Sequence, residues 1–115
     1  MKGLFPTMLL AAVAVPAFAQ GAIGVMPRGV YNCELPGDAA RDVGVPQPER
    51  QLRIKSASRY MAPQGSGTYL RRGDTMTLTS GPRQGERYTV VSDNFIRLVG
   101  ADGQPGPVRC IRTGH

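Results

Sequence analysis

Apolar and polar side chains alternate along Gly29-Val30-Tyr31-Asn32-Cys33-Glu34-Leu35. Because successive side chains of a β-strand point to opposite faces, Tyr31, Cys33 and Leu35 share one face. The stretch therefore predicts a half-buried strand. It also bears on the topology, because the 115-residue chain has one other cysteine, Cys110, close to its C-terminus.

The same period of two recurs in short runs that are separated by turn residues. Threonine alternates with apolar residues over 75–79, which is typical of a strand with one wet and one buried face. No stretch beyond the N-terminal segment shows a sustained helical period. The expected strands lie over 29–35, 52–56, 68–71 (beginning as early as Tyr60), 75–79, 87–90, 96–98 and 108–110.

The two cysteines allow one intramolecular disulfide, between Cys33 and Cys110. An oxidising compartment makes this bond the expected state, with free buried thiols or an intermolecular bridge as alternatives. The closed loop of 78 residues, counting both ends, predicts a stabilisation of roughly 4 to 4.5 kcal/mol in the chain-entropy model.

Short strands about ten residues apart indicate a β-sandwich or a barrel. Bridged cysteines have Cα atoms within about 7 Å, so the first and last strands must be neighbours or face each other across the core. In an up-and-down meander, contact between these strands closes a barrel and removes exposed edges. We therefore expect an all-β fold, a small antiparallel meander of about seven strands that forms a closed or nearly closed barrel. A β-sandwich is the alternative, although the chain has no tryptophan to pack beside the bridge as in immunoglobulin-type sandwiches.

The N-terminus has the features of an export signal. Lys2 precedes an apolar run over 4–15, and Pro16-Ala17-Phe18-Ala19 ends in the small-x-small pattern of a cleavage site. The run is shorter than the ~20 residues that a membrane span needs. We expect residues 1–19 to be a signal peptide cleaved after Ala19, and the mature protein to be periplasmic or secreted. Beyond it, we expect a flexible segment over 20–28 and a single β domain over 29–113, with a long loop at 36–50.

Catalytic residue patterns are scarce in the sequence. The single histidine is the terminal His115, so a serine or cysteine nucleophile lacks a positioned imidazole base. Bridged cysteines cannot bind zinc, and no glycine-rich phosphate loop with a following lysine occurs. We expect a non-enzyme without cofactor or metal. A hydrolase that uses two of the eight acidic residues is the less favoured alternative, because most of the aspartates fall in turns.

The chain is basic, with a formal net charge of +6, and all but two of its cations are arginines. Arginine favours bidentate contacts to phosphate or carboxylate. We expect a patch at one barrel end that contacts an anionic envelope component: lipid phosphates, acidic polysaccharide or cell-wall peptide. The structural alternative is a solvated face that keeps the protein in solution. Nucleic acid is not expected in an extracytoplasmic compartment. The residues of this expected anion-binding patch are Arg59, Arg71, Arg72, Arg83 and Arg87.

A carrier with a pocket inside the barrel is the other functional alternative. Barrels of about eight strands can just hold one small ligand, whereas smaller ones fill with their own side chains. Seven strands favour a filled interior, in which the tyrosine hydroxyls bond to one another or to neighbouring groups.

Four segments together resemble a family of small exported bacterial β-proteins of unknown function, often labelled "elongation factor P". The resemblance covers most of 29–112 and implies no activity, ligand or catalytic residue. The segments that carry it are Gly29-Val30-Tyr31-Asn32-Cys33-Glu34-Leu35-Pro36-Gly37-Asp38, Gly65-Ser66-Gly67-Thr68-Tyr69-Leu70-Arg71-Arg72-Gly73-Asp74, Thr79-Ser80-Gly81-Pro82 with Gly85, and Arg109-Cys110-Ile111-Arg112.

A role in translation is not expected from that label. Elongation factor P is a cytoplasmic, acidic protein of several barrels that acts through a residue, commonly a modified lysine, on a protruding loop. This chain has an export signal, room for one barrel and a basic charge. Its one lysine after the signal, Lys55, lies inside an alternating strand pattern and not at a glycine- or proline-rich loop tip.

Overall fold

The computed structural model describes residues 22–37 and 44–114. Within these ranges the chain is all-β, with a single turn of 3-10 helix at Pro48–Arg50. The strands are β1 (Ile23–Gly24), β2 (Gly29–Leu35), β3 (Val45–Pro46), β4 (Leu52–Ile54), β5 (Arg59–Ala62), β6 (Gly65–Arg72), β7 (Thr75–Leu78), β8 (Arg87–Ser92), β9 (Phe95–Val99) and β10 (Pro105–Gly114).

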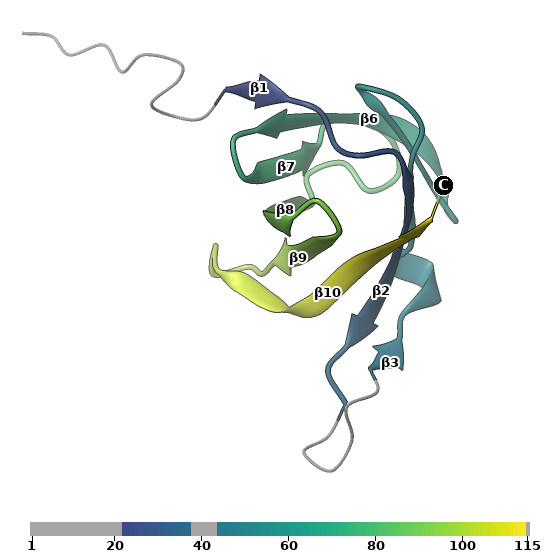
Figure 1. Ribbon diagram of the computed structural model, residues 1–115, viewed down its shortest axis with the longest axis vertical. Helices are drawn as coiled ribbons and strands as arrows, with labels where there is room; N and C mark the ends of the chain where they lie inside the picture. Colours follow the sequence, from purple (N-terminus) through teal and green to yellow (C-terminus); the bar gives the residue numbers. More distant parts are fainter. Residues whose placement is uncertain (1–21, 38–43, 115) are drawn as a thin grey trace, which may run out of the picture.

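Eight of these strands close into an antiparallel barrel. The order β6-β5-β4-β2-β10-β9-β8-β7 is completed by pairing of β7 with β6, so the ring has no open side. Each strand pairs with the next barrel strand in the sequence, which is the expected up-and-down meander, and the ring returns where β10 meets β2 (Figure 1). The predicted barrel is confirmed over the sandwich.

The expected disulfide is confirmed. Cys33 on β2 and Cys110 on β10 are bonded and lie opposite each other in the antiparallel ladder, with 3.9 Å between their Cα atoms. The bond therefore joins the first barrel strand to the last, across a sequence separation of 77.

The barrel has one strand more than the expected seven because the run from Tyr60 to Arg71 forms two strands. β5 and β6 pair as a hairpin in which Ala62 lies opposite Gly65. The turn between them contains Pro63, and Gly65 has a φ of 145°, a conformation that glycine adopts readily. The hairpin places Gly67 opposite Tyr60, so the aromatic ring covers the position where no side chain exists.

Buried side chains fill the barrel interior. Tyrosines are its largest side chains. The hydroxyls of Tyr31 and Tyr60 donate to the backbone carbonyls of Pro27 and Ser80, each at 2.8 Å, whereas the Tyr88 hydroxyl donates to the Glu86 carboxylate at 2.7 Å. Eight strands give an interior just wide enough for such side chains. The buried apolar residues are Met26, Tyr31, Cys33, Leu52, Ile54, Tyr60, Tyr69, Met76, Leu78, Tyr88, Val90, Ile96, Val108 and Cys110.

The described part of the expected flexible segment 20–28 is instead packed against the barrel. β1 pairs with the last residues of β6, and Met26 is buried. The Met26 backbone N–H donates to the Tyr69 hydroxyl at 3.0 Å. Met26 closes the barrel opening where β2 begins and β6 ends, which we call the Met26 end. Opposite it lies the Arg83 end, which loop 79–86 covers.

The expected long loop at 36–50 contains short regular elements in its described part. β3 pairs with β2, with Pro46 opposite Glu34, and the 3-10 turn follows directly. Residues 38–43 and the expected signal peptide 1–19 lie outside the described residues. Among the residues described, no helix is long and apolar enough to cross a membrane.

Candidate functional site

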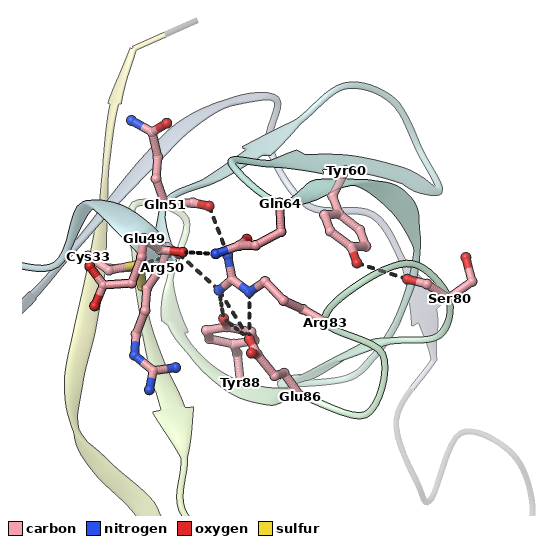
Figure 2. Close-up of polar contacts among 11 residues, drawn as sticks. Cys33, Glu49, Arg50, Gln51, Tyr60, Gln64, Ser80, Arg83, Glu86 and Tyr88 are labelled. Carbon is pink, nitrogen blue, oxygen red and sulfur yellow. Dashed lines mark hydrogen bonds and ion pairs between the residues drawn. A yellow bond between two sulfur atoms is a disulfide. The ribbon is translucent and has the colours of Figure 1, made fainter.

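Arg83 is buried at the Arg83 end and holds several elements together. Its guanidinium donates to the carbonyls of Gln51 and Arg50, both at 3.0 Å, and to the Tyr88 hydroxyl at 2.7 Å. It also forms an ion pair with Glu86 at 3.0 Å. Figure 2 shows the side chain reaching from its loop towards these groups across the barrel opening.

The network favours the charged form of Arg83. Burial by itself disfavours the cation, but hydrogen bonds and attraction to Glu86 and Tyr88 outweigh it, so the pKa of Arg83 is raised. Burial is also the main reason why the pKa of the Tyr88 hydroxyl is raised. A buried cation whose donors are satisfied by protein carbonyls is a structural plug rather than a binding group for an external anion.

Arg71 has a related structural role at the Met26 end. Its Nε donates to the Gly73 carbonyl at 2.9 Å and its Nη1 to the Val25 carbonyl at 3.0 Å. The half-buried side chain thereby ties the segment after β1 to the end of β6. These bonds use donor groups that an external phosphate would otherwise take.

The five arginines of the expected patch do not gather at one barrel end. Arg59, Arg71 and Arg72 lie at the Met26 end, where β5 begins and β6 ends, whereas Arg83 and Arg87 lie at the opposite end. The expectation of a single patch is therefore wrong. No pattern in the sequence indicates that the 79–86 loop turns the Arg83 side chain inward.

A different group of cations lies together on the outer face of β2, β4 and β5. Gly29 is opposite Ile54 at the end of the β2–β4 ladder, and Arg28 and Lys55, the residues just beyond this pair, line the same pocket. The Lys55 backbone N–H donates to the Arg59 carbonyl at 2.9 Å, which continues the row onto β5. We call Arg28, Lys55 and Arg59 the cationic row. All three residues are exposed.

An open pocket of about 340 Å³ lies at this row. Arg28 and Lys55 line it together with Arg53, and its floor is formed by Gly29 and Ile54. Gly29 has a φ of 138° and its Cα lies against the backbone of Gly114, so any larger residue would meet that carbonyl.

The cations of the row do not take part in the ion pairs found in the described chain. Those ion pairs are Arg83 with Glu86 and, at 2.7 Å, Arg109 with Glu34. Like charges side by side on neighbouring strands repel. An arrangement of this kind is stabilised when an anion lies between the cations.

Neither described pocket offers the groups that a hydrolase needs. Their lining residues include no carboxylate. Glu34 and Glu86 are each engaged by an arginine, and the described residues contain no cluster of three or more side chains able to hold a metal ion.

Comparison of the chain with protein-family models, with curated proteins and with solved structures finds no match in any of the three. The candidate site therefore stands on its geometry alone.

Arg59 is the one residue that the expected patch and the cationic row share. Arg28 and Lys55 were not among the residues predicted from the sequence. The alternation of Leu52 and Ile54 with Arg53 and Lys55 already indicated that Lys55 lies on an outer face. The position of Arg28 beside it depends on the β2–β4 register, which no local pattern in the sequence reveals.

Proposed function

We propose that the protein is an exported, non-catalytic binding module whose cationic row binds an anionic group of an envelope component. The observation that carries this proposal is the placement of Arg28, Lys55 and Arg59 side by side at the ends of three neighbouring strands, with a pocket that Arg28 and Lys55 line. The buried disulfide supports an oxidising compartment, periplasmic or extracellular, as the place of action.

The row suits phosphate or carboxylate better than a diffuse polyanion. Arginine offers a planar pair of donors, while lysine adds a compact charge that adjusts to the anion. Arg53, one residue before Ile54 on β4, adds a second arginine to the same pocket. A group with two or three acceptor oxygens can contact more than one of these side chains at once.

Titration with pyrophosphate at low salt tests the proposal, with calorimetry for affinity and NMR for location. We expect shifts at residues 28–30 and 53–55. Lys55→Gln should weaken binding about three- to tenfold, which corresponds to losing one exposed charge contact worth about 1 kcal/mol.

Arg87→Gln is the matched control, because it removes one charge from an exposed residue at the other barrel end. It should leave the affinity unchanged. Equal weakening in both variants would mean that net charge alone attracts the anion, and an absence of binding at low salt would remove the proposal.

A further inference from the structure

The outer face of β2, β4 and β5 changes character along the strands. The cationic row lies at the Met26 end. At the next outward position along these strands, Val30, Arg53 and Met61 lie opposite one another in the ladder. Further towards the Arg83 end, the face continues with Gln51 and Pro63. The face is thus charged at one end, and its other end combines the exposed apolar side chain of Met61 with Gln51, which donates a hydrogen bond to Asn32 at 2.8 Å.

A second open pocket, of about 300 Å³, lies in this part of the face. It is lined by Val30, Gln51, Arg53, Met61, Ala62 and Pro63. Met61 is 44% exposed, although a side chain of this kind is usually buried. Arg53 lines both pockets, so the two hollows adjoin each other across a single side chain.

We infer that this face binds an anionic lipid, with the headgroup phosphate at the cationic row and the first part of an acyl chain along Val30, Met61 and Pro63. This inference rests on the proposed function and adds the class of ligand. From Lys55 to Gln51 the strand extends about 13 Å, at roughly 3.3 Å per residue. That length accommodates a headgroup and the beginning of one chain.

The order of charged and apolar groups along this face favours a lipid over the other anionic envelope components. A polysaccharide or a cell-wall peptide would leave the exposed Met61 side chain without an apolar partner. A lipid matches both halves of the face, because its charge and its hydrocarbon are adjacent in the same order. The aliphatic stem of Arg53 can cover the chain while its guanidinium contacts the phosphate.

The test compares three probes on the full mature protein. They are glycerophosphoglycerol, which is a phosphatidylglycerol headgroup alone, its decanoyl lysolipid below the critical micelle concentration, and decanoyl lysophosphatidylcholine. We expect the anionic lysolipid to bind at least about tenfold more tightly than the headgroup, because it buries methylene groups. The zwitterionic lysolipid should bind more weakly than the anionic one.

Met61→Ser should weaken lysolipid binding about three- to tenfold and leave headgroup binding unchanged. Val91→Ser is the matched control, since Val91 is an equally apolar, 55% exposed residue on β8, away from this face. It should change neither affinity. Circular dichroism verifies that both variants fold.

The outcomes separate this inference from the proposed function. If the headgroup and the anionic lysolipid bind equally, or if both serine variants weaken lysolipid binding alike, the lipid assignment is wrong while anion binding stands. Equal binding of the two lysolipids would likewise overturn it. If no anionic probe binds, the proposed function fails as well.

Discussion

Cys33 on β2 lies directly opposite Cys110 on β10, and the disulfide between them closes the barrel covalently at the seam where its first and last strands meet. Next to the bond, Arg109 and Glu34 form an ion pair at 2.7 Å on the outer side of the same two strands. The seam brings together residues far apart in sequence, so its formation carries the largest loss of chain entropy.

Removing the disulfide should lower stability strongly. For Cys33→Ala with Cys110→Ala we expect a loss of about 4 kcal/mol, because the unfolded chain regains the freedom of a long loop. For a domain of this size that corresponds to a fall in Tm of roughly 15–30 °C. Thermal unfolding followed by circular dichroism measures it.

Val108→Ala provides the control for lost packing, because it removes buried volume from the same strand without opening the chain. It should cost clearly less than the double cysteine variant. Equal costs for the two would show that packing, and not the covalent link, accounts for the effect.

The Arg83 plug should contribute more to stability than any exposed arginine. Arg83→Met leaves the Glu86 carboxylate and the Arg50 and Gln51 carbonyls without this donor, so we expect a loss of about 2–4 kcal/mol in the free energy of unfolding. Arg87→Met, in an exposed position, should change it by about 0.5 kcal/mol at most. Urea denaturation compares them, and equal effects would contradict the structural role of Arg83.

The fold could be predicted to a large extent from the sequence, because a period of two and a pair of distant cysteines restrict the topology severely. Tyr31 and Cys33 share the buried face that their spacing predicts. The division of 59–72 into β5 and β6 was missed. The residue pattern on either side of Pro63 is also compatible with one long strand, so it does not indicate the turn there. The packing of Met26 was missed because the segment is too short to show a period, and of its apolar residues Ile23 and Val25 are exposed while Met26 is buried.

The candidate site was less predictable for a physical reason. Arginine is used in this chain in three ways, as a plug (Arg83), as a tie between segments (Arg71) and as an exposed cation (Arg59). The sequence shows the same residue type in each case. Only the register of neighbouring strands and the path of the 79–86 loop distinguish the exposed cations from those whose donors are already used.

Alkaline pH should destabilise the barrel through its buried tyrosines. Burial raises the pKa of Tyr31 from 10.0 to about 12. The unfolded chain therefore loses its phenolic proton before the folded one, so stability is complete below pH 10 and falls as the pH rises through 12. Tyr31 alone should account for a loss of about 2 kcal/mol by pH 12.

Denaturant unfolding at a series of pH values from 8 to 12 checks this. Tyr31→Phe should be less stable than the native protein at pH 8, because it loses the hydrogen bond to the Pro27 carbonyl. It should also lose less stability between pH 10 and 12. Parallel pH curves for the two proteins would contradict the assignment to Tyr31.

Gly67 should tolerate no side chain. A Cβ atom there would overlap the Ser80 carbonyl and lie 2.8 Å from Cε1 of Tyr60. We expect Gly67→Ala to cost about 1–3 kcal/mol, as for other overpacked sites. Ser66→Ala, at the exposed neighbouring position, should be close to neutral. Thermal unfolding of both variants tests it, and a neutral Gly67→Ala would mean that both the Ser80 backbone and the Tyr60 ring can move aside.

Repulsion within the cationic row should be measurable without any ligand. Arg28, Lys55 and Arg59 lie side by side on three neighbouring strands, and like charges in this arrangement destabilise a sheet. Lys55→Gln should therefore raise the free energy of unfolding by a few tenths of a kcal/mol at low salt. The gain should disappear at high salt, because ions screen exposed charges over about 3 Å at 1 M.

Arg87→Gln again serves as the control, since it removes the same charge at an exposed position opposite Thr77. Chemical denaturation in sodium chloride, from low salt to about 1 M, separates the two variants. A stabilisation by Lys55→Gln that is larger at low salt than that by Arg87→Gln indicates local repulsion, which an anion bound at the row would relieve. If the free energy of unfolding of the two variants depends on salt in the same way, the three cations of the row do not repel one another measurably. That result would speak against an anion site at this position.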